Sequence, residues 1–184
     1  MIPKKKQYHL NIFKKAKLKK LVGKLSKKTD FVIVCMNWGN KNKNKPSKKQ
    51  IKLAKALTKN GANLIIGYHP SVIQPVSIVK SKRKRSLVFW SLGHFVSDSK
   101  KKFSFLGAIA NITISKRKKK AYISEYNMIP IINHKEEGKH YSIYKLSQYS
   151  ELLFNKSKLN VTNLTRKDII AKCEKLIGGF ADCY

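Results

Sequence analysis

The residue best placed to do chemistry in this chain is His69, which follows a short apolar run and precedes a proline. Residues 64–67 predict a strand, and their continuous apolarity is typical of a strand covered on both faces. Pro70 keeps the following residues out of a regular ladder, so His69 should lie at a strand end, where α/β folds place functional groups. An imidazole there can bind a metal ion or transfer a proton near neutral pH. The alternative is a histidine that only hydrogen-bonds its own loop, and this stretch alone favours that role.

A second polar residue, Asn37, stands at the end of another apolar run, residues 31–36. Between the two runs, residues 47–59 repeat apolar side chains at helical spacing. Strand, helix and strand joined by short loops predict a βαβ unit with parallel strands and a right-handed crossover. Asn37 and His69 should therefore leave the same carboxyl edge of a sheet.

The remaining elements follow from hydrophobic periodicity and turn residues. Residues 11–28 predict a helix with lysines on one face; covering the sheet fits it better than lying on a membrane surface. Later segments predict strands at 76–79, 86–92, 107–114 and 121–128, and amphipathic helices at 144–154 and 167–177. Basic turns at 80–85 and 116–120 are interpreted as solvated hairpin tips rather than nucleic-acid patches. We therefore expect a domain over residues 9–132 and a polar, partly helical tail over residues 133–184.

The composition is that of a folded but strongly basic protein. Hydrophobic residues make up 42% of the 184 residues, which suits one domain with a core. Lys and Arg number 41 against 9 Asp and Glu, giving a net charge of +32, and such a surface attracts polyanions. The basic residues are nearly all lysines and are spread along the chain, which favours an AT-rich genome over selection for binding. No nucleic-acid-binding motif is present.

Cysteine usage and hydropathy leave the cellular location open. Cys35 lies within an apolar run and is expected to pack there. Cys173 and Cys183 could pair, but an odd number of cysteines without a signal peptide argues against a disulfide framework. No apolar stretch approaches the ~20 residues that a membrane-spanning helix needs.

Three segments together resemble one family. Residues 30–39 (Asp-Phe-Val-Ile-Val-Cys-Met-Asn-Trp-Gly) resemble a strand leading to His-Trp-Gly, and residues 67–75 resemble Gly-x-His-Pro-His-Val-x-Gln-Pro. Residues 91–98 resemble Ser-Leu-Gly-Asn-Phe-Val-x-Asp. In order and spacing these motifs are similar to those of the CapA (PgsA-like) proteins of bacterial poly-γ-glutamate capsule synthesis, which are related to calcineurin-like metallophosphoesterases. The resemblance covers residues 30–132.

The resemblance implies an α/β fold, specifically the second half of a four-layer α/β/β/α sandwich with a hydrolase-like site at the carboxyl ends of the strands. It implies a divalent metal (Mn, Fe or Zn), with His69 as catalytic residue and metal ligand and Asn37 as a weak ligand. It also implies substrate-binding positions at Trp38, Gly39, Gly93 and His94. The implied partners are poly-γ-glutamate and a separate chain that supplies the missing N-terminal half. Family members are often attached to the cell surface or membrane.

The chain departs from the family pattern where metal chemistry would need it most. Asn37 and Ser71 stand where the family has histidines, and His94 stands where it has asparagine. A two-metal site needs several strong ligands around ions ~3.5–4 Å apart, and neutral oxygens bind transition metals more weakly than imidazole does. We therefore expect a truncated CapA-like capsule biosynthesis protein whose hydrolase site is degenerate and whose activity is impaired or lost.

Two other functions stay open from the sequence. The chain could be a non-enzymatic polyanion-binding protein that uses its lysine surface on poly-γ-glutamate or nucleic acid. It could also be a gene fragment without stable function, because half of a two-sheet sandwich leaves apolar surface uncovered.

Overall fold

The computed structural model describes residues 14–99, 101, 103–118, 120–138, 140–158 and 164–177. In chain order its elements are α1 (Lys15–Lys28), β1 (Ile33–Asn37), α2 (Lys48–Asn60), β2 (Leu64–Tyr68), β3 (Ile73–Ser81), β4 (Lys84–Leu92), β5 (Leu106–Arg117), β6 (Lys120–Lys135), β7 (Tyr141–Lys145), a 3-10 turn (Leu146–Gln148), α3 (Glu151–Lys156) and α4 (Arg166–Ile177). The strands form a four-stranded sheet in the order β1-β2-β4-β3 and a three-stranded sheet in the order β5-β6-β7.

The predicted βαβ unit is confirmed. β1 and β2 pair in parallel, and α2 connects them. Ser47 and Gln50 form a capping box at the start of α2, and Gly61 ends the helix in the left-handed conformation with φ of 107°. β4 is also parallel to β2, whereas β3 returns antiparallel to β4 at the edge of the sheet. Pro75 is tolerated within β3 because an edge strand can lack one donor.

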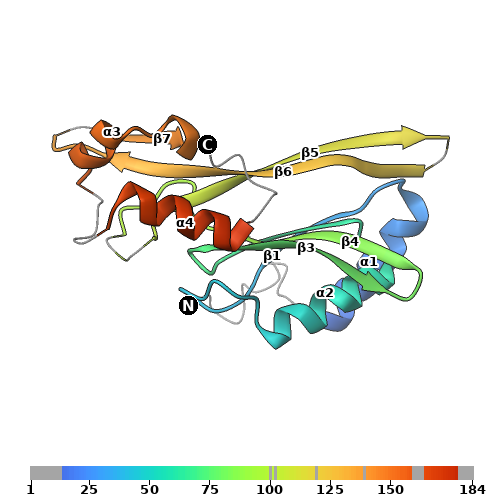
Figure 1. Cartoon of the computed structure of the whole chain (residues 1–184). Coiled ribbons are helices and arrows are strands. Elements are labelled where there is room, and N and C mark those ends of the chain that lie inside the picture. Colours follow the sequence, from blue (N-terminus) through green and yellow to red (C-terminus); the bar gives the residue numbers. More distant parts are fainter. Residues whose placement is uncertain are drawn as a thin grey trace.

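Two apolar layers hold the elements together (Figure 1). α1 and α2 cover one face of the four-stranded sheet, where Ala54, Leu57 and Ile65 are fully or almost fully buried. The other face packs against the β5-β6-β7 sheet and α4 through a larger cluster that includes Phe89 and Met128. The molecule is therefore a mixed α/β structure with two sheets and covering helices, as expected for a partial α/β sandwich.

β1, which forms from the apolar run at residues 31–36, is exposed on one face. Val34 and Met36 are buried, but the alternate residues Ile33 and Cys35 are exposed, and Ile33 keeps 50% of its surface. The expectation that Cys35 packs in the core is therefore wrong. The physical reason is that β1 is the edge strand of its sheet, and the main inter-sheet cluster gathers around β2, β3 and β4.

The C-terminal region differs most from the expected elements. Residues 144 and 145, expected to begin a helix, instead end β7, because β6 extends to Lys135 and offers an edge with which residues 141–145 pair, and the helix α3 begins only at Glu151. The expected helix at 167–177 is confirmed as α4. Residue 132, where the domain was expected to end, lies inside β6, and residues beyond it, including Tyr149 and Ile169, are buried in the same core. Cys183 lies outside the described residues, whereas Cys173 is fully buried in the core.

Candidate functional site at the carboxyl edge of the first sheet

Three neighbouring parallel strands end at one edge of the four-stranded sheet. β1 ends at Asn37, which pairs with Tyr68 at the end of β2, and β4 ends at Leu92. His69 and His94 follow the ends of β2 and β4. The prediction that Asn37 and His69 leave the same edge is confirmed, and the third motif joins them there.

Trp38 and Gly67 pack in the protein interior beneath the loops at this edge. The Trp38 indole N–H donates a 2.9 Å hydrogen bond to the carbonyl oxygen of Trp90, and the two indole rings stack with centroids 5.5 Å apart. To reach β4, the Trp38 indole crosses Gly67, where a Cβ would lie only 2.3 Å from the indole nitrogen and 2.1 Å from the Trp90 oxygen. Trp38 is 7% exposed, so its side chain lies in the core. Its predicted contact with substrate stays a prediction.

Gln74 fixes the loop that follows β1. Its amide nitrogen donates to the carbonyl oxygens of Lys43 and Lys45 at 2.7 and 3.1 Å, and its amide oxygen accepts from Gln50 at 3.0 Å. Gly39 has a φ of 87° and lies against the Gln50 side chain, where a Cβ would have only 2.8 Å. Gln74 of the second motif thus holds the β1–α2 loop in place, a role that the sequence alone did not reveal.

The loop after β2 presents His69 in an unusual backbone conformation. His69 and Ser71 have φ values of 103° and 63°, in the left-handed region that non-glycine residues rarely adopt. The His69 side chain is exposed, and it has no hydrogen-bond partner among the described residues. Strained backbone of this kind persists where surrounding structure imposes it and is concentrated at functional sites. Pro70 supplies part of that constraint through its carbonyl oxygen, which accepts from the Asn42 N–H at 2.7 Å.

His94 lies where the two sheets meet. Gly93, with φ of 71°, forms an isolated bridge to Gly107 at the beginning of the second sheet. A Cβ on Gly107 would lie 1.9 Å from the His94 carbonyl oxygen, so this approach requires glycine. The Nδ1 atom of His94 is buried and has no hydrogen-bond partner among the described residues.

Comparison with known proteins identifies the family to which this chain belongs. The family described as "Bacterial capsule synthesis protein PGA_cap" matches residues 2–99, a stretch that contains all three motifs. The chain belongs to this family. It is 35% identical over 78 residues to the "PGA biosynthesis protein CapA" of Bacillus subtilis (strain 168) and 44% identical over 69 residues to the "Capsule biosynthesis protein CapA" of Bacillus anthracis.

Each match is partial. The aligned stretches are 42% and 38% of this chain but only 20% and 16% of the two relatives. The family match of this PGA_cap-family chain therefore covers the four-stranded sheet that carries the three motifs. Within the described helices, none is both long and apolar enough to cross a membrane.

The donor set at the edge does not suit a dinuclear metal centre. Across the described residues, no group of three or more His, Cys, Asp or Glu side chains could hold a metal ion. At this edge the strongest candidate ligand is the His69 imidazole, and Asn37 and Ser71 offer only neutral oxygens. His94 turns one ring nitrogen into the protein interior. We therefore derive no chemical step through a metal ion here.

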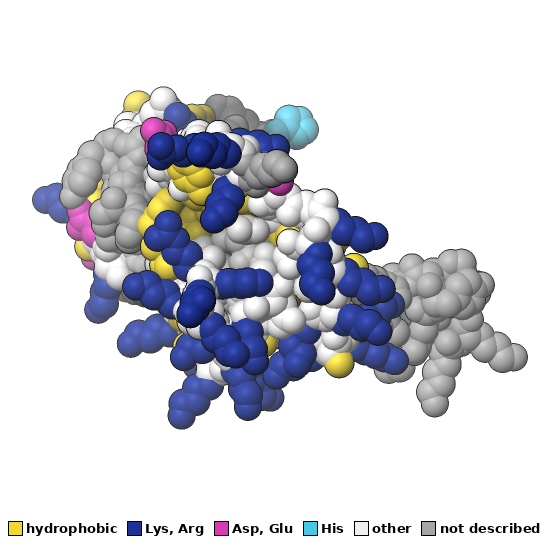
Figure 2. Space-filling view, turned by 90° about the vertical axis from the view of Figure 1, so that its right-hand side faces the viewer, with side chains coloured by type: hydrophobic (Ala, Val, Ile, Leu, Met, Phe, Trp, Pro, Cys, Tyr) yellow, Lys and Arg dark blue, Asp and Glu magenta, His cyan; other side chains and the backbone are white. Residues whose placement is uncertain are grey.

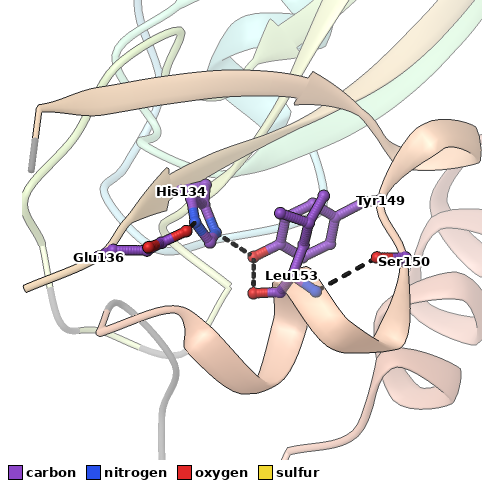
Figure 3. Close-up of polar contacts among 5 residues, drawn as sticks. All are labelled: His134, Glu136, Tyr149, Ser150 and Leu153. Atoms are coloured by element: carbon purple, nitrogen blue, oxygen red, sulfur yellow. Dashed lines mark hydrogen bonds and ion pairs between the residues drawn. The ribbon is translucent and has the colours of Figure 1, made fainter.

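One polar cluster lies far along the chain from the motifs and was not predicted (Figure 3). His134, 3% exposed, contacts the Tyr149 hydroxyl through Nδ1 at 2.8 Å and the Glu136 carboxylate through Nε2 at 3.3 Å. A carboxylate only accepts, so His134 Nε2 donates to Glu136, and the Tyr149 hydroxyl donates to the Leu153 carbonyl oxygen at 3.4 Å. Burial raises the pKa of Tyr149 to about 12, which keeps the phenol protonated. No sequence pattern predicted this cluster, because its members lie in a segment expected to be a polar tail.

Proposed function

We propose that this protein acts in the biosynthesis of an anionic bacterial capsule polymer, and that it does so without metal-dependent hydrolysis at the carboxyl edge of its first sheet. The capsule role follows from membership of the PGA_cap family and from the names of the two Bacillus relatives. The aligned share of those relatives is small, so their full activity is not transferred to this chain.

The observation that carries the second part is the donor set around His69. The fold retains the structural half of the motifs, with Trp38, Gly67 and Gln74 in tight, buried contacts. The positions from which ligands would come instead hold Asn37, Ser71 and the half-buried His94. Neutral amide and hydroxyl oxygens are poor substitutes for imidazole in transition-metal binding. A scaffold that is kept without strong metal ligands supports the proposal of a degenerate hydrolase site.

The metal content of the full-length purified protein tests this second part directly. After incubation with Mn²⁺, Fe²⁺ or Zn²⁺ and removal of free metal, elemental analysis should find far less than one equivalent per chain. The matched variant Asn37→His/Ser71→His restores two imidazoles and should retain more metal than the natural chain. Stoichiometric metal in the natural protein would refute a degenerate site.

Gene replacement tests the capsule role and separates it from hydrolysis. Deletion of the gene in its own bacterium should lower the amount of cell-bound anionic polymer, and the natural gene should restore it. A His69→Ala gene should restore it equally well, because no step depends on that imidazole. Normal polymer in the deletion strain would contradict the capsule role, whereas failure of only the His69→Ala gene would contradict the hydrolysis-free part.

The predicted partner chain that completes the sheet remains a proposal. It is supported by the position of β1 at the sheet edge and by its exposed face around Ile33. An unpaired strand edge of this kind can accept a further strand.

A further inference from the structure

A basic cleft lies between the two sheets at the edge opposite the motif loops. It has a volume of about 810 Å³, within the range of ligand sites. Its lining includes Asp30 before β1, Asn63 before β2 and Leu87 near the start of β4. These are the amino ends of the three parallel strands, so the cleft is separate from the edge that carries His69.

Both basic turns of the sequence converge on this cleft. The hairpin between β3 and β4 contributes Arg83, Lys84 and Arg85, and Lys120 comes from the hairpin between β5 and β6. The chain contains only four arginines, and the two hairpin tips hold three of them, with Arg117 beside Lys120. The lysines are spread over the whole chain, but the arginines are not. Arginine binds carboxylates through a two-pronged hydrogen-bonded contact that lysine cannot make.

The positive charge of the cleft is not neutralised within the protein. Asp30 is the one acidic residue in the described lining, and its carboxylate already forms a 2.7 Å ion pair with Lys116 of β5. This ion pair also links the second sheet to the segment before β1. Figure 2 faces this end of the molecule and shows many Lys and Arg side chains spread over it, with few acidic side chains.

Apolar surface accompanies the charges. Ile78 and Tyr122 line the cleft and remain 49% and 46% exposed. A ligand that suits both features carries anionic groups separated by short aliphatic links. The cleft lies between two layers of the protein, so it suits one extended chain better than a duplex, whose width exceeds a single chain.

We propose that this cleft binds a segment of a linear polycarboxylate, with Arg83 and Arg85 holding carboxylates from one hairpin and Lys120 from the other. This inference rests on the proposed capsule role for the choice of a polycarboxylate among polyanions. It assigns the contact with polymer to the amino edge of the sheet rather than to the loops at its carboxyl edge.

Binding of fluorescently labelled oligo-γ-glutamate to the full chain, followed by anisotropy over a salt series, tests the proposal. The variant Arg83→Gln/Arg85→Gln/Lys120→Gln should weaken binding roughly tenfold or more, because charge-assisted contacts are lost. The control Lys48→Gln/Lys52→Gln/Lys55→Gln removes the same charge from the exposed side of α2 and should change affinity less than about twofold. Arg83→Lys/Arg85→Lys keeps the charge and should weaken binding by an intermediate factor.

Several results would overturn the proposal. Equal losses in the cleft variant and the α2 control would show attraction by net charge alone. Tighter binding of a single-stranded DNA of equal charge, with the same sensitivity to the cleft variant, would assign the cleft to nucleic acid. Thermal unfolding of each variant verifies that it is folded, and the single Lys120→Gln variant provides a second test should the triple variant unfold. Failure of this binding alongside a capsule defect in the deletion strain would reject the cleft and retain the capsule role.

Discussion

At the scale of single residues, some motif residues form the packed edge of the sheet and others are exposed on its loops. Gly67 belongs to the first group, because the Trp38 indole and the Trp90 carbonyl oxygen occupy the space that a side chain would need. His69 belongs to the second, since its side chain is exposed on a strained loop. Family resemblance in sequence therefore reports the architecture of the edge more directly than its chemistry.

Substitution Gly67→Ala should destabilise the protein by at least about 3 kcal/mol, because the new methyl group collides with backbone that cannot move aside. Urea unfolding measures the effect. Gly23→Ala is the matched control: its Cβ would be 3.6 Å from the nearest atom, and alanine should stabilise α1 by roughly 0.5–1 kcal/mol. A Gly67→Ala protein as stable as the natural one would contradict the tight packing of Trp38.

Tyr149 should make the stability fall at high pH. In the unfolded chain the phenol ionises near 10.0, whereas in the folded protein its pKa is about 12. Between these values the unfolded state has lost a proton that the folded state retains, so the free energy of unfolding decreases by roughly 2 kcal/mol as pH rises.

The variant Tyr149→Phe isolates this effect from lysine deprotonation. It should be less stable than the natural protein at pH 8, because the buried Nδ1 atom of His134 loses its hydrogen-bond partner. The difference between the two proteins should then shrink as the pH approaches 12, as measured by urea unfolding at each pH. A constant difference would show that the phenol does not remain protonated in the folded state.

At the scale of elements, the predictable parts were those in which local pattern and tertiary contacts agree. The βαβ unit was predicted because residues 47–59 carry a helical apolar repeat between two apolar runs, and the structure adds a capping box and a terminal glycine to α2. β7 was not predictable, because its pairing depends on the length of β6. The exposed face of β1 depends on sheet order, which hydrophobicity does not encode. The His134 cluster joins residues that no local pattern connects.

The loop between β1 and α2 should depend on Gln74. Replacement Gln74→Leu removes two donated hydrogen bonds and leaves Gln50 without its acceptor, which should cost about 2–4 kcal/mol. Hydrogen exchange should show loss of protection at the Asn42 amide, which donates to Pro70. Ser47→Ala, which removes the helix cap and the bond from the Ser47 hydroxyl to the Gln50 side chain but keeps Gln74, should cost about 1 kcal/mol and leave that amide protected. Unchanged exchange in Gln74→Leu would mean that the loop is held by other contacts.

At the scale of the whole molecule, charge repulsion opposes folding. The net charge is +32, and the ion pairs identified among the described residues are few and mostly exposed, such as Lys116–Asp30 and Lys158–Glu137. Repulsion between like charges on a compact protein is relieved by screening.

The melting temperature should therefore rise by several degrees as sodium chloride increases from about 20 to 500 mM. Differential scanning calorimetry measures it. The Lys48→Gln/Lys52→Gln/Lys55→Gln protein carries three fewer charges and should show a smaller rise. A melting temperature that falls with salt would mean that attractive pairs outweigh the repulsion.

The bridge between Gly93 and Gly107 makes the two edges of the two-sheet arrangement unequal. It joins the sheets by backbone at one edge, whereas at the other edge the exposed Asp30–Lys116 pair is a contact between side-chain tips. The two sheets are thus joined by backbone beside His94, and the arginine-bearing hairpin tips lie at the opposite edge. A ligand that separated the sheets at the Asp30–Lys116 edge would therefore strain the backbone bridge beside His94.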